Sequence, residues 1–418
     1  MQLKSFLFNF SLLILLISIL IYWSIDMSYE EIEARNNKAK CIDGSNYKFL
    51  LSKGKNNGKK SFYIHFEMGG FCGDDNYSPD NSNAPLVSCL ERTKTSLGSN
   101  KFSFIYRYFN IYISRFLTSC KLFNPMFYNW NKIYIKYCDG SLHLGNVEQP
   151  IIYNNTKLYI RGEENVKFVL SYLIENTDFK NAENVLTVGS SAGGIASVFY
   201  SKYIKSILSK KTNYKVISDS GYFLESNYSL PYKNKNVLRD MLTKLKNSFH
   251  ISKTKSMSLY GTNLDFVNSC FPKTYINTFN KDFDILFLTS AYDSWALKRV
   301  LISTCFFKKN FIDDCSLKEK EIFTKYSNDF IEEISKIILN DKEKKITAFV
   351  NNGFFHTYLT FSWSLNSKKY GIGGYSVQQF IKDWYNNILP KNKKLYYDNK
   401  GTKKLADFYW CMHYYNLF

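Results

Sequence analysis

One ten-residue stretch, Val185–Gly194, limits the possible folds of this chain more than any other. An apolar run there ends in Gly-Ser-Ser-Ala-Gly, which fits the pattern G-x-S-x-G. In that pattern a strand turns sharply into a helix and presents a strained serine, so small residues are needed on both sides. The string alone is common in ordinary turns. Here Asn184–Val188 is typical of a buried strand, and apolar residues recur afterwards at helical spacing (Ile195, Val198, Phe199, Tyr203, Ile204 and Ile207). We therefore expect Ser191 to be a nucleophile at a helix N-terminus, where the helix dipole favours developing negative charge.

Two later loops supply candidates for an acid and a base. In an α/β hydrolase the acid and the histidine follow the serine along the chain, each on a loop after a later strand. The apolar run Asp284–Ser290 is followed by Asp293, and the apolar run 345–350 is followed by His356. We therefore predict a triad of Ser191, Asp293 and His356.

The other acids and histidines are weaker candidates. Asp219 also follows an apolar run, 215–218, but it comes only one strand after the nucleophile, so we expect it to support the site from behind. His65 lies within an early apolar run, and three histidines lack a strand end before them (His143, His250 and His413). Core or surface positions are expected for these four.

A glycine pair follows an early strand. The run 61–66 is expected to be a strand, and it leads into Glu-Met-Gly-Gly-Phe-Cys at 67–72. An oxyanion hole needs two backbone N–H groups aimed at one oxygen with no side chain in the way. Gly69 and Gly70, together with the amide of Ala192, are therefore the predicted donors, and an ordinary glycine turn is the alternative.

The same stretches resemble the pectin acetylesterase and Notum family of carboxylesterases, over nearly all of the chain after the N-terminal segment. The resemblance implies an α/β-hydrolase fold, with a mostly parallel central sheet flanked by helices and with insertions. It places the family's triad on Ser191, Asp293 and His356. The matching stretches, in chain order, are 41–45, 66–72, 89–99, 129–140, 161–162, 189–194, 219–224, 291–295 and 349–356.

The sequence departs from that family's pattern in two places. The three-glycine oxyanion loop with a tryptophan is represented here by Met68-Gly69-Gly70-Phe71, which keeps two glycines and changes the walls. Two cysteines that usually flank the histidine are replaced by Gly353 and Thr357. Because both are absent together, we expect one disulfide fewer and an intact site.

Nine cysteines are present, and the family resemblance implies three disulfides. The implied pairs are Cys72–Cys89, Cys41–Cys138 and Cys305–Cys315. Cys270 with Cys411 is a weaker assignment, which leaves Cys120 over. No cysteine or histidine spacing is typical of a zinc site, so neither a metal nor a cofactor is predicted.

Length and the absence of linkers favour a single domain. The 418 residues contain no linker-like stretch and no repeat in the body, so we expect one catalytic domain over residues 36–418. The net charge of +19 comes from lysines spread through loops without a nucleic-acid motif. We predict no nucleic-acid partner, although a basic rim that attracts a polyanionic glycan stays open. Further helices are expected over Glu163–Ile174, over Lys318–Leu339 and around Val377–Trp384.

Residues 1–28 are expected to be a signal anchor or signal peptide. The apolar run Phe6–Ile25 is long enough to span a bilayer and has no small-residue cleavage site, which favours a retained anchor with the body outside the cytosol. Secretion after cleavage is the alternative. Three N-x-S/T sequons are candidate glycosylation sites in that compartment, at Asn76, Asn154 and Asn227.

The function expected from these features is that of a serine carboxylesterase. Its substrate would be an acylated glycan, with O-acetyl groups favoured because the larger side chain of Met68 would crowd the mouth of the acyl pocket. A carboxylesterase that removes a lipid from a secreted protein is the first alternative. A non-catalytic glycan- or protein-binding module that keeps the fold is the second.

Overall fold

A nine-stranded sheet organises the part of the chain that the computed structural model describes, which is residues 29–35, 38–75, 77–101, 115–232, 234–251, 264–276, 283–303, 305, 315–359 and 371–398. Strand β2 (Lys48–Ser52) is antiparallel to both of its neighbours, β1 (Tyr29–Glu33) and β4 (Asn131–Ile135), and all further pairs across the sheet, from β4 to β11 (Leu395–Tyr397), are parallel. The strands, in spatial order, are β1 (Tyr29–Glu33), β2 (Lys48–Ser52), β4 (Asn131–Ile135), β3 (Ser61–Phe66), β7 (Asn184–Ser190), β8 (Asn213–Asp219), β9 (Asp284–Ser290), β10 (Ile346–Asn351) and β11 (Leu395–Tyr397). A separate hairpin joins β5 (Ile151–Tyr153) to β6 (Thr156–Leu158).

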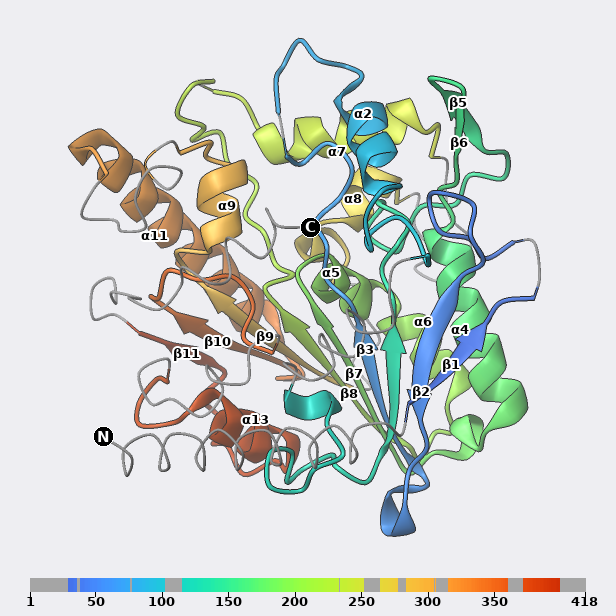
Figure 1. Ribbon diagram of the computed structural model, residues 1–418. Helices are drawn as coiled ribbons and strands as arrows, with labels where there is room; N and C mark the ends of the chain where they lie inside the picture. The colour runs from blue at the N-terminus through green and yellow to red at the C-terminus, as the bar shows by residue number, and fades with distance from the viewer. Residues whose placement is uncertain are drawn as a thin grey trace, which may run out of the picture.

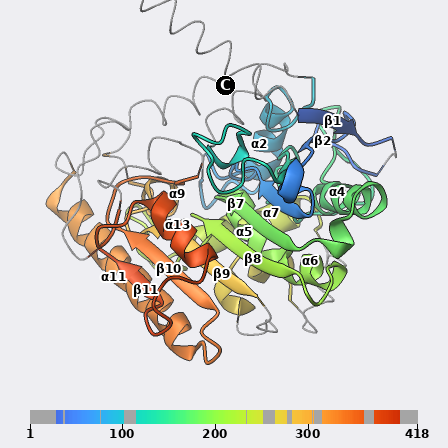
Figure 2. The same ribbon diagram turned by 90° about the horizontal axis from the view of Figure 1, so that it is seen from below.

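Helices cover both faces of the sheet, which explains why its central strands are apolar on both sides. Along β9, Ile285 and Phe287 belong to one core, while Leu286 and Leu288 belong to the other. The first core also contains residues of α4, α5, α7 and α11, and the second contains those of α13. Figure 2 shows α13 and α11 on opposite sides of β9 and β10.

The carboxyl ends of the parallel strands point toward α2, α7 and α9, at the top of Figure 1. Loops at this edge carry the ligands and catalytic groups of open α/β sheets. The helices are α2 (Ala84–Arg92), α4 (Gly162–Asn176), α5 (Ala192–Phe199), α6 (Ser201–Ile207), α7 (Val237–Ser248), α8 (Phe266–Ser269), α9 (Ser294–Arg299), α11 (Leu317–Asn340) and α13 (Val377–Tyr385), with short 3₁₀ turns at 56–58, 115–117, 179–181 and 272–274.

The predicted fold class is confirmed, and the expected central elements lie within three residues of their predicted bounds. The helix expected after the nucleophile is interrupted at Tyr200 and forms α5 and α6. The predicted domain start at residue 36 excludes β1, yet β1 pairs with β2 along its whole length. The sequence of β1 lacks the apolar pattern that predicts a strand. Instead, Glu31 and Glu33 form ion pairs with Lys48 at 2.7 Å and 3.2 Å on this edge of the sheet.

Three disulfides are present, and they are the three that the family resemblance implied: Cys41–Cys138, Cys72–Cys89 and Cys305–Cys315. Cys120 and the buried Cys270 have no disulfide partner within the described ranges. Cys411, the partner proposed for Cys270, lies outside them.

Several other predictions fall on residues outside the described ranges, namely the apolar run Phe6–Ile25, the sequon at Asn76 and His413. Within the described ranges, no helix combines the length and the hydropathy needed to cross a bilayer. Asn154 and Asn227 are both exposed, as glycosylation at either residue requires.

Removal of a disulfide should cost more stability the longer the loop that it closes. In the chain-entropy model, the Cys41→Ala/Cys138→Ala variant, which opens a 97-residue separation, should lose about 4–5 kcal/mol. The Cys305→Ala/Cys315→Ala variant, with a separation of 10, should lose about 3 kcal/mol or less. Urea unfolding without reductant measures both losses. A larger loss from the short loop would contradict this ranking.

Candidate active site

Ser191 stands at the junction of β7 and α5 in a conformation that few residues adopt, with φ 53° and ψ −118°. The chain packs so closely here that a Cβ on Gly189 would lie 1.9 Å from the carbonyl oxygen of Gly193. The Ser191 N–H donates to the carbonyl oxygen of Asp219 at 2.7 Å, which ties the turn to the end of β8. Strain of this kind persists only where the surroundings enforce it, as they do at functional sites.

Asp293 and His356 lie together, although 63 residues separate them in sequence. His356 Nδ1 lies 2.7 Å from Asp293 Oδ2, and Asp293 Oδ1 accepts the N–H groups of Trp295 and Ala296 at the start of α9. Because a carboxylate oxygen accepts, Nδ1 carries the proton and Nε2 is left as the basic nitrogen. Nε2 is buried and has no hydrogen-bond partner among the described residues. The pair therefore offers an oriented imidazole with its basic nitrogen unoccupied.

Two aromatic rings flank this imidazole. The ring of Trp295 lies parallel to it at 6.2 Å, and the ring of Phe223 lies at 6.3 Å. Phe71, which follows the glycine pair, is 6.2 Å from Trp295. The loop after β3 and the histidine loop thus share one aromatic wall.

The segment after β8 holds the serine turn and the histidine loop in place relative to each other. The Asp219 carboxylate accepts a hydrogen bond from the Ser190 hydroxyl at 2.9 Å in the serine turn. It also accepts hydrogen bonds from the N–H groups of Tyr358 and Leu359 in the histidine loop, at 2.8 Å and 2.9 Å. Next to it, Ser220 Oγ accepts the N–H of Thr357 at 3.0 Å. Burial raises the pKa of Asp219 to about 6, against the effect of its three donors. Asp219 therefore supports both loops, while His356 is paired with Asp293.

The loop at 67–72 has room for glycine alone at two positions. Gly70 has φ +60°, and a Cβ on Gly69 would lie 2.3 Å from the Tyr137 ring. The N–H groups of Gly69 and Gly70 donate to no other group in the described part of the chain. Ala192 is the first residue of α5, so its N–H also lacks an intrahelical acceptor.

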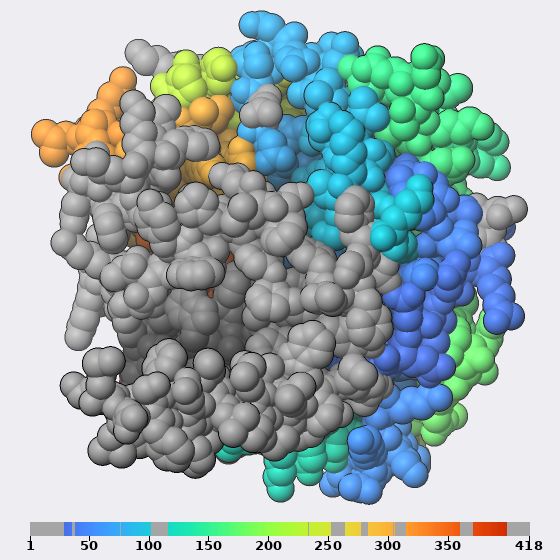
Figure 3. All heavy atoms as spheres, viewed as in Figure 1, coloured from blue at the N-terminus to red at the C-terminus, as the bar shows by residue number. Residues whose placement is uncertain are grey.

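The glycine loop is tied to the helix that Asp293 caps. Arg299, the last residue of α9, pairs with Asp75 through its Nη2 at 2.5 Å. In Figure 3 the orange atoms around residue 300 meet the blue atoms of the N-terminal third along the upper edge of this face. The elements that carry the glycine pair and the acid are therefore in direct contact.

The remaining described histidines serve the core or the surface. His65 and His143 are buried and His250 is exposed. Burial lowers the pKa of His65 to about 3 and that of His143 to about 4. His143 Nε2 donates to the carbonyl oxygen of Glu67 at 2.9 Å, at the start of the glycine loop.

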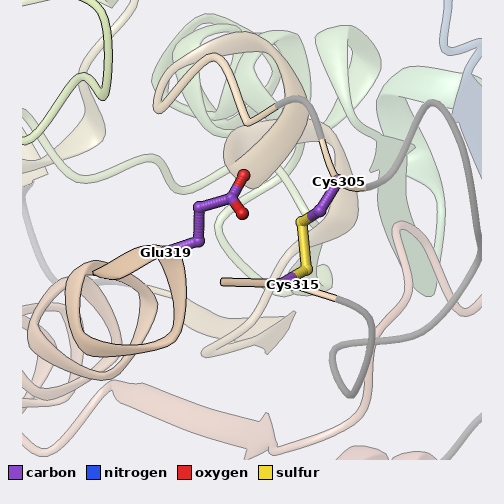
Figure 4. Close-up of side chains that lie close together, drawn as sticks. All are labelled: Cys305, Cys315 and Glu319. Carbon is purple, nitrogen blue, oxygen red and sulfur yellow. A yellow bond between two sulfur atoms is a disulfide. The ribbon is translucent and has the colours of Figure 1, made fainter. Parts of the chain in front are cut away.

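The one described cluster with the composition of a metal site is Cys305, Cys315 and Glu319. Figure 4 shows its two sulfur atoms bonded to each other. The Glu319 carboxylate accepts the N–H and the hydroxyl of Ser316 at 3.0 Å and 2.9 Å, and so caps α11. Because the two sulfur atoms form a disulfide and the carboxylate caps the helix, this cluster is structural.

Comparisons with known proteins identify the family. A family model described as Pectinacetylesterase matches residues 25–405. Pectin acetylesterase 7 of Arabidopsis thaliana is 31% identical over 317 residues, which are 74% of this chain and 73% of that protein. The palmitoleoyl-protein carboxylesterase NOTUM of Schmidtea mediterranea is 29% identical over 46% of this chain and 34% of its own.

A solved structure shares the fold. The Wnt deacylase Notum from Drosophila superposes with a TM-score of 0.67 at 16% sequence identity, covering 90% of this chain and 97% of that one. At that identity the likeness concerns the fold, and it extends over almost the whole of both chains.

Acid should destabilise the protein partly through His143. The pKa of His143 in the folded protein, about 4, lies below the ordinary value of 6.5. Its contribution to the free energy of unfolding is therefore complete above pH 6.5 and is lost as the pH falls through about 4. In a His143→Gln variant, whose amide can still donate to Glu67, the loss of unfolding free energy between pH 7 and 4.5 should be smaller by about 2–3 kcal/mol. Groups common to both proteins cancel in this difference. Parallel stability curves from chemical unfolding would refute the assignment.

Proposed function

The chain belongs to the pectinacetylesterase family and is a carboxylic ester hydrolase, and we propose that it is a serine carboxylesterase that removes short O-acyl groups from a glycan. The observation that carries the proposal is the Asp293–His356 pair, whose buried Nε2 has no partner in the described structure. The strained Ser191 is fastened to the same Asp219–Ser220 segment as the histidine loop.

The proposed reaction uses these groups in two steps. Ser191 Oγ attacks the ester carbonyl carbon while His356 Nε2 takes its proton, and Asp293 stabilises the resulting imidazolium. The amides of Gly69, Gly70 and Ala192 bind the oxyanion. When the carbonyl reforms, the bond to the sugar oxygen breaks, and His356 gives the proton to that oxygen, so that the sugar leaves as an alcohol. Water then attacks the acyl-enzyme by the same route and releases the free acid and Ser191.

A glycan substrate is supported by the relatives and by charge. Four pectin acetylesterases from Arabidopsis match over 73–83% of their own length, whereas the match to the planarian NOTUM covers 34% of that protein. The net charge of +19 would attract an acidic polysaccharide. Removal of a lipid from a protein is the second candidate, supported by the match to the palmitoleoyl-protein carboxylesterase NOTUM of Schmidtea mediterranea.

We place the catalytic body outside the cytosol, free or attached through its N-terminal segment. Three disulfides support this location, because such bonds persist in oxidising compartments. Glycans at the exposed Asn154 and Asn227 would fit the same location. Membrane attachment rests on the composition of residues 6–25 alone.

Ser191→Ala should lower kcat/KM on p-nitrophenyl acetate by about four orders of magnitude or more, because the variant lacks the nucleophile. The fold should survive, since the change removes one hydroxyl and no core volume. Ser190→Ala is the matched control, because Ser190 contacts Asp219 and carries no reacting group in this scheme. If Ser191→Ala retains activity and Ser190→Ala loses it, the nucleophile is Ser190 and the assignment of Ser191 is wrong.

Asp293→Asn should also be strongly impaired in ester hydrolysis, whereas Asp219→Asn should mainly lower the stability of the protein.

Acyl chain length separates the glycan deacetylase from the lipid-removing alternative. Each methylene in an apolar pocket is worth about 1–3 kcal/mol, so p-nitrophenyl esters of two to twelve carbons resolve a shallow pocket from a deep one. We expect kcat/KM to be highest for acetate and to fall with length. A steady rise toward the long chains would instead favour delipidation. Release of acetate from acetylated pectin tests the carrier directly.

A further inference from the structure

Three carbonyl oxygens of the glycine loop are held by two side chains from other parts of the fold. Arg92 Nη1 donates to the carbonyl oxygen of Gly69 at 2.6 Å, and Arg92 Nη2 donates to that of Phe71 at 3.0 Å. Tyr137 Oη donates to the carbonyl oxygen of Gly70, which lies between them, at 2.7 Å. The loop therefore has no freedom to rotate these carbonyls without breaking a hydrogen bond to a buried side chain.

We propose that Arg92 is a positioning residue for ester hydrolysis, which aims the Gly70 N–H at the oxyanion by holding the carbonyl of Gly69. This inference rests on the proposed function, because it concerns the oxyanion hole of that reaction. Arg92 acts through the backbone and touches neither substrate nor reacting atoms in this scheme.

The planarity of the peptide bond links the two groups. In a trans peptide the C=O of one residue and the N–H of the next point in opposite directions within one plane. The contact from Arg92 to the Gly69 carbonyl therefore also fixes the direction of the Gly70 N–H, away from the guanidinium. That N–H has no acceptor within the described residues. At φ +60° Gly70 has an unusual backbone with no side chain to steady it, so the orientation depends on these outside contacts.

The guanidinium is itself held in a fixed place. Arg92 ends α2 and is 8% exposed, and its Nη2 also lies 3.3 Å from Asp74 Oδ1. The other Asp74 oxygen accepts the N–H of Phe71 at 3.1 Å. One turn earlier, Cys89 is bonded to Cys72 of the same loop. Arginine suits this role because its planar fork reaches two carbonyls at once, which a lysine ammonium cannot do with the same geometry.

The test compares transition-state stabilisation with ground-state binding in Arg92→Lys, Arg92→Met and Asp74→Asn. For each folded protein, kcat and KM are measured with p-nitrophenyl acetate, and Kd with an alkyl trifluoromethyl ketone. Ser191 Oγ adds to the ketone carbon, its proton passes to His356, and the ketone oxygen becomes the oxyanion. Loss of a whole oxyanion donor costs about 10²–10³ in kcat, so misaiming one should cost Arg92→Lys about 10- to 100-fold.

The expected pattern is a fall in kcat with KM changed by no more than about threefold, and a rise in ketone Kd by the same factor as the loss of kcat/KM. Arg161→Lys is the matched control, because Arg161 is also 8% exposed and donates to two backbone carbonyls, of Lys38 and Val147, outside the loop. A merely structural role for Arg92 would lower thermal stability in both lysine variants and leave ketone affinity unchanged, which would overturn the inference.

The Ser191→Ala protein separates failure of the inference from failure of the proposed function. If Ser191→Ala is inactive and does not bind the ketone while Arg92→Lys retains wild-type kcat and Kd, the triad stands and the role of Arg92 is wrong. If Ser191→Ala hydrolyses the ester and binds the ketone normally, the proposed nucleophile is wrong, and the assignment of the oxyanion hole fails together with the proposed function. Should Arg92→Met not fold, Arg92→Lys and Asp74→Asn still decide the matter.

Discussion

The buried carboxylate of Asp219 is the interaction on which the rest of the site depends. It accepts hydrogen bonds from the hydroxyl of Ser190, next to the proposed nucleophile, and from two amides that follow His356, and so joins two loops that neighbouring strands alone would leave independent. Burial raises its pKa to about 6, so the stability that it contributes is present below pH 3.8 and is lost as the pH rises through about 6. At neutral pH the buried group is ionised, and its three hydrogen-bond donors offset part of the cost of burying that charge.

The glycine loop is held by a different set of forces. Arg92 and Tyr137 bind its carbonyls, and the disulfide of Cys72 joins its end to α2. Beyond the loop, Asp75 forms an ion pair with Arg299 of α9. No regular element contains the glycine pair, so the precision that a strand or helix would lend has to come from these side chains. This arrangement leaves the amides of Gly69 and Gly70 free for an anion, which a regular hydrogen-bonded ladder would not permit.

The local sequence pattern predicts those parts of the structure that depend on neighbouring residues in the chain. Buried parallel strands are continuous apolar runs, so β3, β7, β9 and β10 could be predicted, and the residues at their ends gave the Asp293–His356 pair. β1 escaped prediction because an edge strand with ion-paired glutamates has no apolar signal. The role of Arg92 also escaped, since it depends on contacts with carbonyls 21 and 23 residues away. Arg92 lies within the stretch 89–99 that resembles the family, but its partners are distant in sequence.

Gly353 and Thr357 stand where the family resemblance implied a cysteine pair, and hydrogen bonds brace the loop between them. Gly353 N–H donates to the side chain of Asn351 and Thr357 N–H donates to Ser220, so noncovalent contacts hold the histidine. The glycine loop, in contrast, retains its sulfur bridge. The two sides of the catalytic centre thus differ in their sensitivity to thiols. A reductant would therefore open the Cys72–Cys89 bond beside the glycine loop and leave the hydrogen bonds of the histidine loop in place, so the redox state of the surroundings acts on one side of the site alone.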